Sequence, residues 1–586
     1  MANRIMIVKK SKCNPEGCGG YLCIRVSPSN RMGEEAIYKS DDGKVAVNEE
    51  VITDGDRIAA NKCPFNALEM VNLPEELDKE PIHRYGKNGF ALFNLPTPIF
   101  GKVVGIIGRN GIGKSTAIKV LADVLKPNLG RVEEDHIATH EELIDYFKGT
   151  EAQTFFEKQK KGEIKVAYKP QQVDMIPKQF NGTVQELLKK VDEKNSFNEL
   201  VEKLELKNFL DHDIKDISGG ELQRVAIAAT VMKDANVYFF DEPTSYLDIK
   251  QRLKISKFIR ELANEETAVM VIEHDMIILD YMTDLVHLMY GKEGAFGIVS
   301  MVKSTKAGIN VYLSGYLKEE NVRFRAGQIK FLKKPPLTKK AEFKLTEWNA
   351  LEHKQGSFNL KVNKGMIYRH ETIGILGENG IGKTTFVKIL AGEIETKDKI
   401  GELKVAYKPQ YLEPTDELVM IFLKRAFDKY KSTIIEPLNL KDFMTRKLNE
   451  LSGGELQRVM IAKCLSEDSD LILMDEPSAY LDVEQRLEVA KIIKDIMFQT
   501  GRSALIVDHD LLFADYLSDQ LIVFEGEPAI SGSVEGPFNM EEGMNNFLED
   551  IELTFRRDDE NNRPRANKLN SQLDREQKST GKLYYL

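Results

Sequence analysis

Two short apolar runs in the chain each end in a pair of acidic residues. Residues 237–240 (VYFF) precede Asp241 and Glu242, and residues 471–474 (LILM) precede Asp475 and Glu476. Short apolar runs without alternation are typical of strands that are buried on both faces of a parallel sheet. We therefore predict two buried strands, each of which delivers carboxylates to the edge of an α/β sheet.

The sequence lacks an apolar stretch of the roughly 18 residues that a membrane span requires. Its first residues, MANRIMIVKKSKC, also lack the apolar region of a signal peptide. A length of 586 residues, with 42% hydrophobic and 30% charged residues, is typical of a soluble chain with three or four domains. The net charge of −10 carries no overall signature of nucleic-acid binding, so that any contact with RNA requires a local basic patch. We expect a protein without a membrane channel.

Five motifs occur twice, in the same order, and divide most of the chain into two copies of one domain. Five matches in one order exclude coincidence. The motif pairs are GRNGIGKST (108–116) with GENGIGKTT (377–385), YKPQ (168–171) with YKPQ (407–410), SGGELQRV (218–225) with SGGELQRV (452–459), FDEPTSYLD (240–248) with MDEPSAYLD (474–482), and IEHD (272–275) with VDHD (507–510).

The first copy carries about 30 extra residues, at roughly 134–163, between its first two motifs. Leu143, Ile144, Phe147, Phe155 and Phe156 are spaced as in two short amphipathic helices around residues 148–150. We expect a basic tip and exposed aromatic side chains that form a docking element. The alternative is a solvated helical hairpin without a partner.

The first motif of each copy, G-x-x-x-x-G-K-[ST], predicts a loop that binds nucleotide phosphates with backbone N–H groups at a helix N-terminus. Lys114 and Lys383 would reach the β- and γ-phosphates of ATP, Ser115 and Thr384 would ligate Mg²⁺, and the strand-end acids Asp241 and Asp475 would bind the same ion. The candidate loop residues are Asn110, Gly111, Gly113, Lys114, Ser115 and Thr116, with Asn379, Gly380, Gly382, Lys383, Thr384 and Thr385.

The SGGELQ motif resembles the signature of ATP-binding-cassette (ABC) ATPases. In that family the signature begins a helix that faces the γ-phosphate held by the opposite cassette. The resemblance implies that ATP joins the two halves and that hydrolysis releases them. By the same resemblance, Ser452 and Gly454 would contact the nucleotide at Lys114, and Ser218 and Gly220 the nucleotide at Lys383.

The resemblance to ABC ATPases assigns further roles to the residues that match its motifs. Tyr85 in HRYG, together with Phe90, resembles the aromatic platform for adenine, whereas the second copy has only Phe358 as a weaker candidate. The remaining assignments are Glu242 and Glu476 to the attacking water, His274 and His509 to the γ-phosphate, Gln171 and Gln410 to Mg²⁺ and water, and Asp248 and Asp482 to the loop that couples the two sites.

Cysteines are concentrated at the N-terminus. Cys13, Cys18, Cys23 and Cys63 fall in the first 63 residues, and only Cys464 lies elsewhere. Disulfides are rare in a large chain without an export signal, so the four clustered cysteines indicate metal ligation. Cys464 follows the second signature and is expected to be a core residue.

Together with HRYG, the insertion, the segment GYLKEENVRFR and the charged C-terminus, the cysteine region resembles ABC subfamily E, the ribosome-recycling ATPases also called RNase L inhibitors. The resemblance covers nearly the whole chain. It implies a ferredoxin-like domain with two [4Fe–4S] clusters on eight cysteines, a cytoplasmic location, and an ATPase that splits ribosomes after termination. The implied partners are the small ribosomal subunit with its rRNA and a termination or release-type factor, with no membrane and with a monomer whose cassettes dimerise internally.

The chain departs from this pattern at four of the eight cysteine positions, which are Ser27, Thr53, Asp56 and Ala59. In two-cluster ferredoxins the fourth cysteine of each run ligates the other cluster, so Cys13, Cys18, Cys23 and Cys63 form one complete set. We therefore expect one retained [4Fe–4S] cluster and one lost site. The interval from Cys18 to Cys23 is one residue longer than expected, and a four-cysteine zinc site is the main alternative.

The expected organisation is an α/β fold in which a small α+β domain precedes two P-loop cassettes. The predicted boundaries are 1–75 for the ferredoxin-like domain, 76–315 for the first cassette, 316–345 for a hinge with Pro335-Pro336, 346–540 for the second cassette and 541–586 for a charged tail. The tail is expected to act as a second hinge strand braced across both cassettes, and Arg556, Arg557, Arg563 and Arg565 are candidates for binding phosphate or acidic partners.

The leading functional hypothesis is therefore a Mg-dependent ATPase that separates ribosomal subunits. Two alternatives remain. A tandem-cassette translation factor of the F type would bind ribosomes without splitting them, but it has a long charged linker and no metal domain. An ATPase of iron–sulfur assembly would transfer a cluster to apo-proteins.

Overall fold

The computed structural model describes residues 4–49, 51–72, 80–132, 136–325, 327–331, 344–394, 403–410 and 413–584. The chain divides into two compact units. The first comprises Met1–Pro243, Ile259–Glu273 and Thr283–Gln328, and the second comprises Thr244–Phe258, His274–Met282 and Ile329–Leu586. Most of the predicted hinge, including Pro335-Pro336, lies outside the described residues, and the predicted domain boundaries stay predictions. Among the described helices, none is long and apolar enough to cross a membrane.

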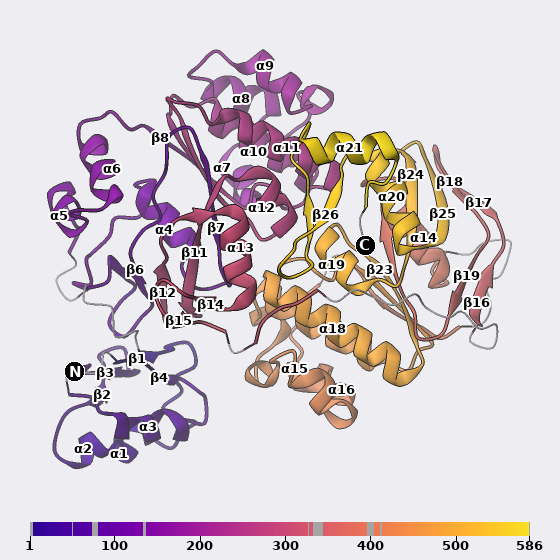
Figure 1. Cartoon of the computed structure of the whole chain (residues 1–586). Helices are drawn as coiled ribbons and strands as arrows, with labels where there is room; N and C mark the ends of the chain where they lie inside the picture. The colour runs from indigo at the N-terminus through magenta and orange to yellow at the C-terminus, as the bar shows by residue number, and fades with distance from the viewer. Residues whose placement is uncertain are drawn as a thin grey trace. The chain divides into compact units, whose positions relative to one another are not determined.

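A small α+β domain begins the first unit, as the sequence predicts (Figure 1). Strand β1 (Arg4–Val8) pairs antiparallel with β4 (Leu68–Asn72). A second antiparallel pair consists of β2 (Ile37–Lys39) and β3 (Val45–Val47). These strands pack with the cysteine-bearing segments around a common core that includes Met6 and Ile37. The helical turns of the domain are α1 (Leu22–Val26), α2 (Pro28–Arg31), η1 (Asp54–Asp56) and α3 (Arg57–Lys62).

The first cassette is built on one large sheet, with the strand order β5-β6-β12-β11-β7-β10-β9-β8. Strands β11, β7, β10, β9 and β8 are parallel neighbours. The central strands are buried throughout, which explains their unbroken apolar sequences. The bounds are β5 (His83–Arg84), β6 (Ala91–Phe93), β7 (Val103–Ile107), β8 (Val166–Lys169), β9 (Val237–Asp241), β10 (Ala268–Ile272), β11 (Leu285–Lys292), β12 (Phe296–Val299) and β13 (Lys303–Ser304).

The second cassette repeats this sheet with the order β17-β18-β25-β24-β20-β23-β22-β21. The parallel core β24-β20-β23-β22-β21 has the same order as the core of the first sheet. This match confirms the duplication and the α/β fold class. The bounds are β16 (Lys344–Trp348), β17 (Leu351–Gln355), β18 (Phe358–Val362), β19 (Gly365–Tyr368), β20 (Thr372–Leu376), β21 (Val405–Lys408), β22 (Leu471–Asp475), β23 (Ser503–Val507), β24 (Gln520–Glu527) and β25 (Ser531–Asn539).

Helices follow the strands at equivalent places in the two copies. Helix α4 follows β7 as α14 follows β20, and α12 follows β10 as α19 follows β23. The first copy contains α4 (Lys114–Leu121), α7 (Ile176–Gln179), α8 (Val184–Val191), α9 (Phe197–Lys203), α10 (Gly219–Val231), α11 (Ile249–Leu262), α12 (Met276–Met282) and α13 (Thr305–Ser314). The second contains α14 (Lys383–Leu390), α15 (Val419–Phe422), α16 (Lys424–Lys429), α17 (Gly453–Ser466), α18 (Val483–Thr500), α19 (Leu511–Leu517) and α20 (Met540–Asp550).

The insertion of the first copy forms the two expected helices, α5 (His140–Tyr146) and α6 (Glu151–Lys160). The expectation of exposed aromatic side chains is wrong. Phe147, Phe155 and Phe156 are buried in the core of the first cassette, and the rings of Phe147 and Phe156 stack at 5.6 Å. The tip, residues 148–150, is exposed and carries one lysine. The apolar face of the hairpin therefore fixes it to its own cassette.

The C-terminal tail is folded. Strands β26 (Phe555–Arg557) and β27 (Pro564–Ala566) form an antiparallel hairpin, and α21 (Gln572–Thr580) follows. Within the second unit, β27 packs on α12 from the first copy, and Arg557 binds Asp515 of α19 from the second. Within this unit the hairpin thus contacts helices of both copies, and its role as a brace across the cassettes stays a prediction.

The role suggested for the tail arginines needs correction. Arg563 and Arg565 are buried and bind Asp280, and Arg557 binds Asp515 through both terminal nitrogens, at 2.9 and 3.0 Å. Arg556 is only half-buried, but it shares the hairpin. Three of the four side chains are therefore paired with carboxylates of this chain and do not offer a surface for phosphate.

Candidate nucleotide sites and cysteine pocket

Each phosphate loop joins a buried strand to a helix, β7 to α4 and β20 to α14. Gly113 and Gly382, directly before these helices, have left-handed φ angles of 89° and 96°. A Cβ at Gly113 would lie 2.6 Å from Cζ of Phe90, and one at Gly382 2.9 Å from Cζ of Phe358. Only glycine satisfies both the backbone angle and the close aromatic contact.

The two phosphate-loop lysines curl back over their loops. Nζ of Lys114 donates to the carbonyl oxygens of Gly108 at 2.9 Å and Arg109 at 2.6 Å. Nζ of Lys383 donates to those of Gly377 at 2.7 Å and Glu378 at 2.6 Å. Burial lowers the pKa of Lys383 to about 8. A bound phosphate would add negative acceptors beside this ammonium group and favour its charged form.

The strand-end aspartates are buried anions near these loops. Asp475 accepts a hydrogen bond of 2.8 Å from Oγ1 of Thr384, which joins the two predicted magnesium ligands of the second copy. Both carboxylate oxygens of Asp241 are buried without a hydrogen-bond partner in the described chain. Burial raises the pKa of both groups. Carboxylate oxygens are hard donors of the kind that Mg²⁺ prefers, so these residues are suited to hold it.

The neighbouring glutamates have an unusual backbone. Glu242 and Glu476 adopt φ angles of 47° and 46°, a left-handed conformation that is rare for residues other than glycine. Nε2 of Gln171 donates to Oε1 of Glu242 at 2.7 Å, and Nε2 of Gln410 donates to Oε1 of Glu476 at the same distance. Each predicted catalytic carboxylate is therefore oriented by the predicted glutamine of its own copy.

Two further residue pairs that sequence reasoning missed support this conformation. Nζ of the buried Lys169 donates to the carbonyl oxygen of Asp241 at 2.9 Å, and Nζ of Lys408 donates to that of Asp475 at 2.7 Å. The signature glutamines Gln223 and Gln457 donate to the carbonyl oxygens of Glu242 and Glu476, each at 2.7 Å. All four lie in the repeated motifs YKPQ and SGGELQ, so the repeat pointed to them without revealing their role.

The predicted histidines are buried in both copies. Nε2 of His509 lies 3.5 Å from Oε1 of Glu476. Burial, followed by the charges of Lys383 and Arg252, holds the pKa of His509 well below its usual value. His509 is therefore neutral at physiological pH and can donate or accept a hydrogen bond but cannot add a positive charge. His274 occupies the equivalent sequence position after β10.

The signature motifs begin helices α10 and α17 with a capping box. Ser218 and Ser452 are the N-cap residues, and their backbone N–H groups donate to Oε2 of Glu221 and Glu455, each at 2.8 Å. The S-x-x-E spacing is the sequence signal for this arrangement. The pairing of Ser218 and Gly220, or Ser452 and Gly454, with the nucleotide of the other copy stays a prediction.

Tyr85 is an exposed aromatic side chain beside the first phosphate loop. Its hydroxyl lies 3.3 Å from Oγ1 of Thr116, and its ring lies 6.4 Å from that of Phe90. Phe358 occupies the place of Phe90 in the second copy, because both rings pack on the last loop glycine. The first site thus has Tyr85 in addition to the phenylalanine ring that both copies place on this glycine.

Within the second unit, the loop after the first copy's acid pair touches the second phosphate loop. Asn379 N donates to Oδ2 of Asp248 at 3.3 Å. Nζ of Lys250 lies 2.5 Å from Oε1 of Glu378. Lys250 is a further residue that the sequence analysis did not single out.

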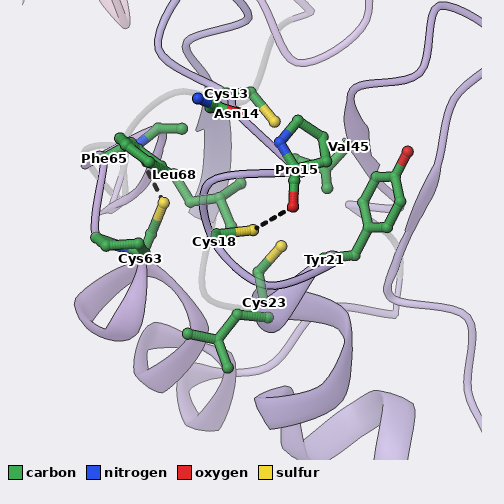
Figure 2. A pocket seen from close by; sticks show the side chains of 13 residues that line it. Cys13, Asn14, Pro15, Cys18, Tyr21, Cys23, Val45, Cys63, Phe65 and Leu68 are labelled. Carbon is green, nitrogen blue, oxygen red and sulfur yellow. Dashed lines mark hydrogen bonds between the residues drawn. The ribbon is translucent and has the colours of Figure 1, made fainter.

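The four N-terminal cysteines line one pocket of the small domain (Figure 2). Cys13 and Cys23 are buried, and Cys18 and Cys63 are half-buried. Apolar side chains such as Phe65 and Leu68 complete the lining. Burial, with smaller contributions from the other three cysteines, raises the pKa of Cys23 to about 11. A cationic metal centre would reverse this shift, so the donor set fits a thiolate-bound metal.

Zinc and an iron–sulfur cluster require different arrangements of the four thiols. Within the described ranges, no group of three or more His, Cys, Asp or Glu side chains is arranged to hold a metal ion. Tetrahedral zinc requires all four sulfur atoms within about 2.3 Å of one point. A [4Fe–4S] cluster would instead bind each cysteine through a different iron.

Two P-loop cassettes, each with a strand-end aspartate, an oriented glutamate and a capped signature helix, define a tandem ABC ATPase. The family model described as ABC transporter matches residues 99–245 and 360–479. The chain is 41% identical over its full length to ABC transporter E family member 1 of Arabidopsis thaliana, of which the match covers 99%. The chain belongs to the E family of ABC proteins.

Two solved structures are similar as well. A model of ribosome-bound archaeal Pelota and ABCE1 contains a chain that is 49% identical, with a TM-score of 0.93 and full coverage of both chains. An archaeal ribosome recycling factor, aABCE1, in complex with the ribosomal stalk protein aP1, is 50% identical with a TM-score of 0.82, over 87% of this chain and all of that one.

Proposed function

We propose that this chain is an ATP-driven ribosome recycling factor that separates ribosomal subunits after termination. The observation that carries the proposal is full-length similarity, with a TM-score of 0.93, to an ABCE1 in a ribosome-bound complex. The two sets of candidate phosphate- and magnesium-binding residues support ATP turnover as the source of work. The small ribosomal subunit with its rRNA and a release-type factor are the proposed partners, and the proposed location is the cytoplasm.

The residues of each site have distinct proposed tasks. Glu476 orients and deprotonates the attacking water, held in place by Gln410 and by its own left-handed backbone. Neutral His509 contacts the γ-phosphate. Lys383 binds the β- and γ-phosphates once they displace its carbonyl partners. Bound Mg²⁺, held by Thr384 and Asp475, supplies charge neutralisation at the phosphates. The equivalent residues of the first copy perform the same tasks.

Closure of the cassettes is the proposed link between ATP and the ribosome. In this scheme the capped N-termini of α10 and α17 each lend a serine and a glycine to the nucleotide bound by the other copy, as the family resemblance implies. A ligand shifts a conformational equilibrium only by its differential affinity for the two states. ATP therefore favours the closed form, and hydrolysis removes that preference.

For the cysteine pocket we propose one [4Fe–4S] cluster on Cys13, Cys18, Cys23 and Cys63. The cluster supplies a rigid link between the loop that carries the first three cysteines and the segment after α3. Iron and acid-labile sulfide analysis of anaerobically purified protein tests this. Zinc at one ion per chain without sulfide would contradict it.

Ribosome splitting is tested by sedimentation of ribosomes with the protein, ATP and a termination factor. We expect free subunits with ATP and the protein bound to small subunits with a non-hydrolysable ATP analogue. Intact ribosomes that carry the protein would contradict recycling and favour a binding factor of the F type. A Glu476→Gln chain that traps ATP without any change in ribosome association would contradict the coupling between the cassettes and the ribosome.

A further inference from the structure

The four cysteine positions that this chain lacks come together in the structure, apart from the retained pocket. Ser27 lies between α1 and α2, Thr53 and Asp56 belong to the turn of η1, and Ala59 lies one helical turn later in α3. Ser27, Asp56 and Ala59 are fully buried. The fold of the family therefore persists around these positions even though all four thiols are absent.

Asp56 is the centre of this group. Its Oδ1 accepts hydrogen bonds from Oγ of Ser27 at 2.5 Å and from N of Ser29 at 3.1 Å. Its Oδ2 accepts from Oγ of Ser29 at 2.5 Å, N of Thr53 at 2.9 Å and Oγ1 of Thr53 at 3.0 Å. Two carboxylate oxygens offer about four lone-pair positions, so five donors saturate them.

This saturation distinguishes the group from a metal site. The alcohols donate to the carboxylate, and its acceptor positions are all used by the chain itself. Burial alone would raise the pKa of Asp56, but the hydrogen bonds from Ser27 and Ser29 outweigh it and lower the pKa to about 2. Nothing in this set offers iron a thiolate or a vacant acceptor. The residues do not fit a second iron–sulfur cluster.

The hydrogen bonds connect the segments that carry these positions. Ser27 caps α2 through N of Asn30, at 3.2 Å, and donates to Asp56 at the same time. Thr53 joins the network from the segment before α3, and its Oγ1 also lies 3.2 Å from Oγ of Ser29. A buried, fully satisfied polar network of this kind specifies a single arrangement of the segments that it joins.

We propose that the Asp56 network replaces the second cluster as a redox-inert structural link, so that the domain contains one metal centre at most. The proposal deepens the cluster assignment above and rests on the family membership. It does not depend on whether the four cysteines hold a cluster or zinc. A domain of this kind contains at most one redox centre and cannot pass electrons between two.

The test combines metal analysis with variants of the full-length chain. Four iron and four sulfide ions per chain are expected, and eight of each would overturn the proposal. Asp56→Asn should keep the parent's metal content but lower the unfolding temperature of the small domain by more than about 5 °C. The exposed Asp41, in the turn between β2 and β3, provides the control, because Asp41→Asn should change neither quantity. An Asp56→Asn chain as stable as the parent would show that the network has no structural role.

A variant with all four missing cysteines restored tests whether these side chains account for the loss of the second cluster. A chain with S27C, T53C, D56C and A59C together should bind about twice the iron and sulfide of the parent. A soluble variant whose iron content equals that of the parent would show that the site was not lost through these four side chains. Zinc without sulfide in the parent would contradict the cluster proposed for the cysteine pocket, and the Asp56→Asn result would still decide the role of the network.

Discussion

Asp280 in α12 anchors the C-terminal hairpin through buried charges. It accepts hydrogen bonds from Nε of Arg565 at 2.7 Å, Nη2 of Arg565 at 2.9 Å and Nη2 of Arg563 at 3.3 Å. The side chains are 4% exposed for Asp280, 9% for Arg565 and 0% for Arg563. Solvent therefore cannot compensate either guanidinium group if the carboxylate is removed.

Asp280→Ala is expected to destabilise the second unit by about 3 kcal/mol. Removing one partner of a buried ion pair costs roughly 3–5 kcal/mol, because an uncompensated charge stays buried. The lower end applies here, since Arg565 keeps a second carboxylate, Asp558, at 3.3 Å. For a unit of this size the loss corresponds to a fall in unfolding temperature of roughly 5–10 °C. Calorimetry of the full chain and the rate of proteolysis in the tail measure it.

Asp515 is the matched control, because it occupies the position of Asp280 in the second copy and binds the other strand of the same hairpin. Arg557 holds it at 2.9 Å, and the hydroxyl of Tyr584 donates to it. The Arg557 side chain is 19% exposed, so water can partly solvate it after Asp515→Ala, and a smaller loss is expected. An Asp280→Ala loss below about 0.5 kcal/mol, the range of surface substitutions, would refute the role of the buried pair.

Three further variants test other contacts of the molecule. Glu476→Gln should keep ATP binding and lower ATP turnover by about 10²-fold or more, measured by phosphate release beside filter binding, because the amide cannot accept the proton of the attacking water. Lys250→Glu should weaken the second unit by about 0.5–1 kcal/mol in urea unfolding, and adding Glu378→Lys should restore it; additive effects would refute the contact. The pKa of Asp56 is about 2 in the folded chain and 3.8 in the unfolded one. Ionised Asp56 should therefore contribute about 2 kcal/mol to the free energy of unfolding. This contribution is fully present above pH 4 and is lost as the pH falls through 2. Asp56→Asn and the parent should therefore converge in stability in acid, and a constant difference between pH 7 and pH 2 would contradict the pKa.

The nucleotide-binding machinery could be predicted from sequence because its chemistry requires contiguous residues. A phosphate loop places its glycines, lysine and hydroxyl within nine residues, and the acid pair directly follows a buried strand. In the structure, Gly113 and Gly382 have left-handed φ angles, and Thr384 donates a hydrogen bond to Asp475. In local motifs of this kind, the spacing along the sequence largely determines how the side chains are arranged.

The errors concern side chains whose partners lie far away in the sequence. The spacing of Phe147, Phe155 and Phe156 predicts a helical face correctly, but periodicity does not reveal that this face packs on the core of the first cassette. Arg565 belongs to a charged segment that resembles a solvated tail. Its partner Asp280 lies 285 residues earlier, and only the tertiary fold brings the two together.

For residues that position the catalytic groups, the sequence indicated the side chains but not their roles. Lys169 and Gln223 lie in motifs that the repeat made conspicuous, but their hydrogen bonds go to backbone carbonyl oxygens, which sequence comparison within the chain cannot identify. Recurrence in both copies showed that these side chains matter. The left-handed backbone of Glu242 that they support became visible only in three dimensions.

The two copies share the residues proposed to act on phosphate and differ in those proposed to contact the adenine base. Lys169 and Lys408, Gln171 and Gln410, and Gln223 and Gln457 make equivalent hydrogen bonds around glutamates with the same backbone angle. A chemical step set by these groups should therefore have a similar barrier at both sites. The segment HKQGSF of the second copy has no tyrosine to match Tyr85 in HRYG. Unequal behaviour of the two sites is therefore expected to arise in nucleotide binding, where an aromatic face would contribute, rather than in the hydrolysis step.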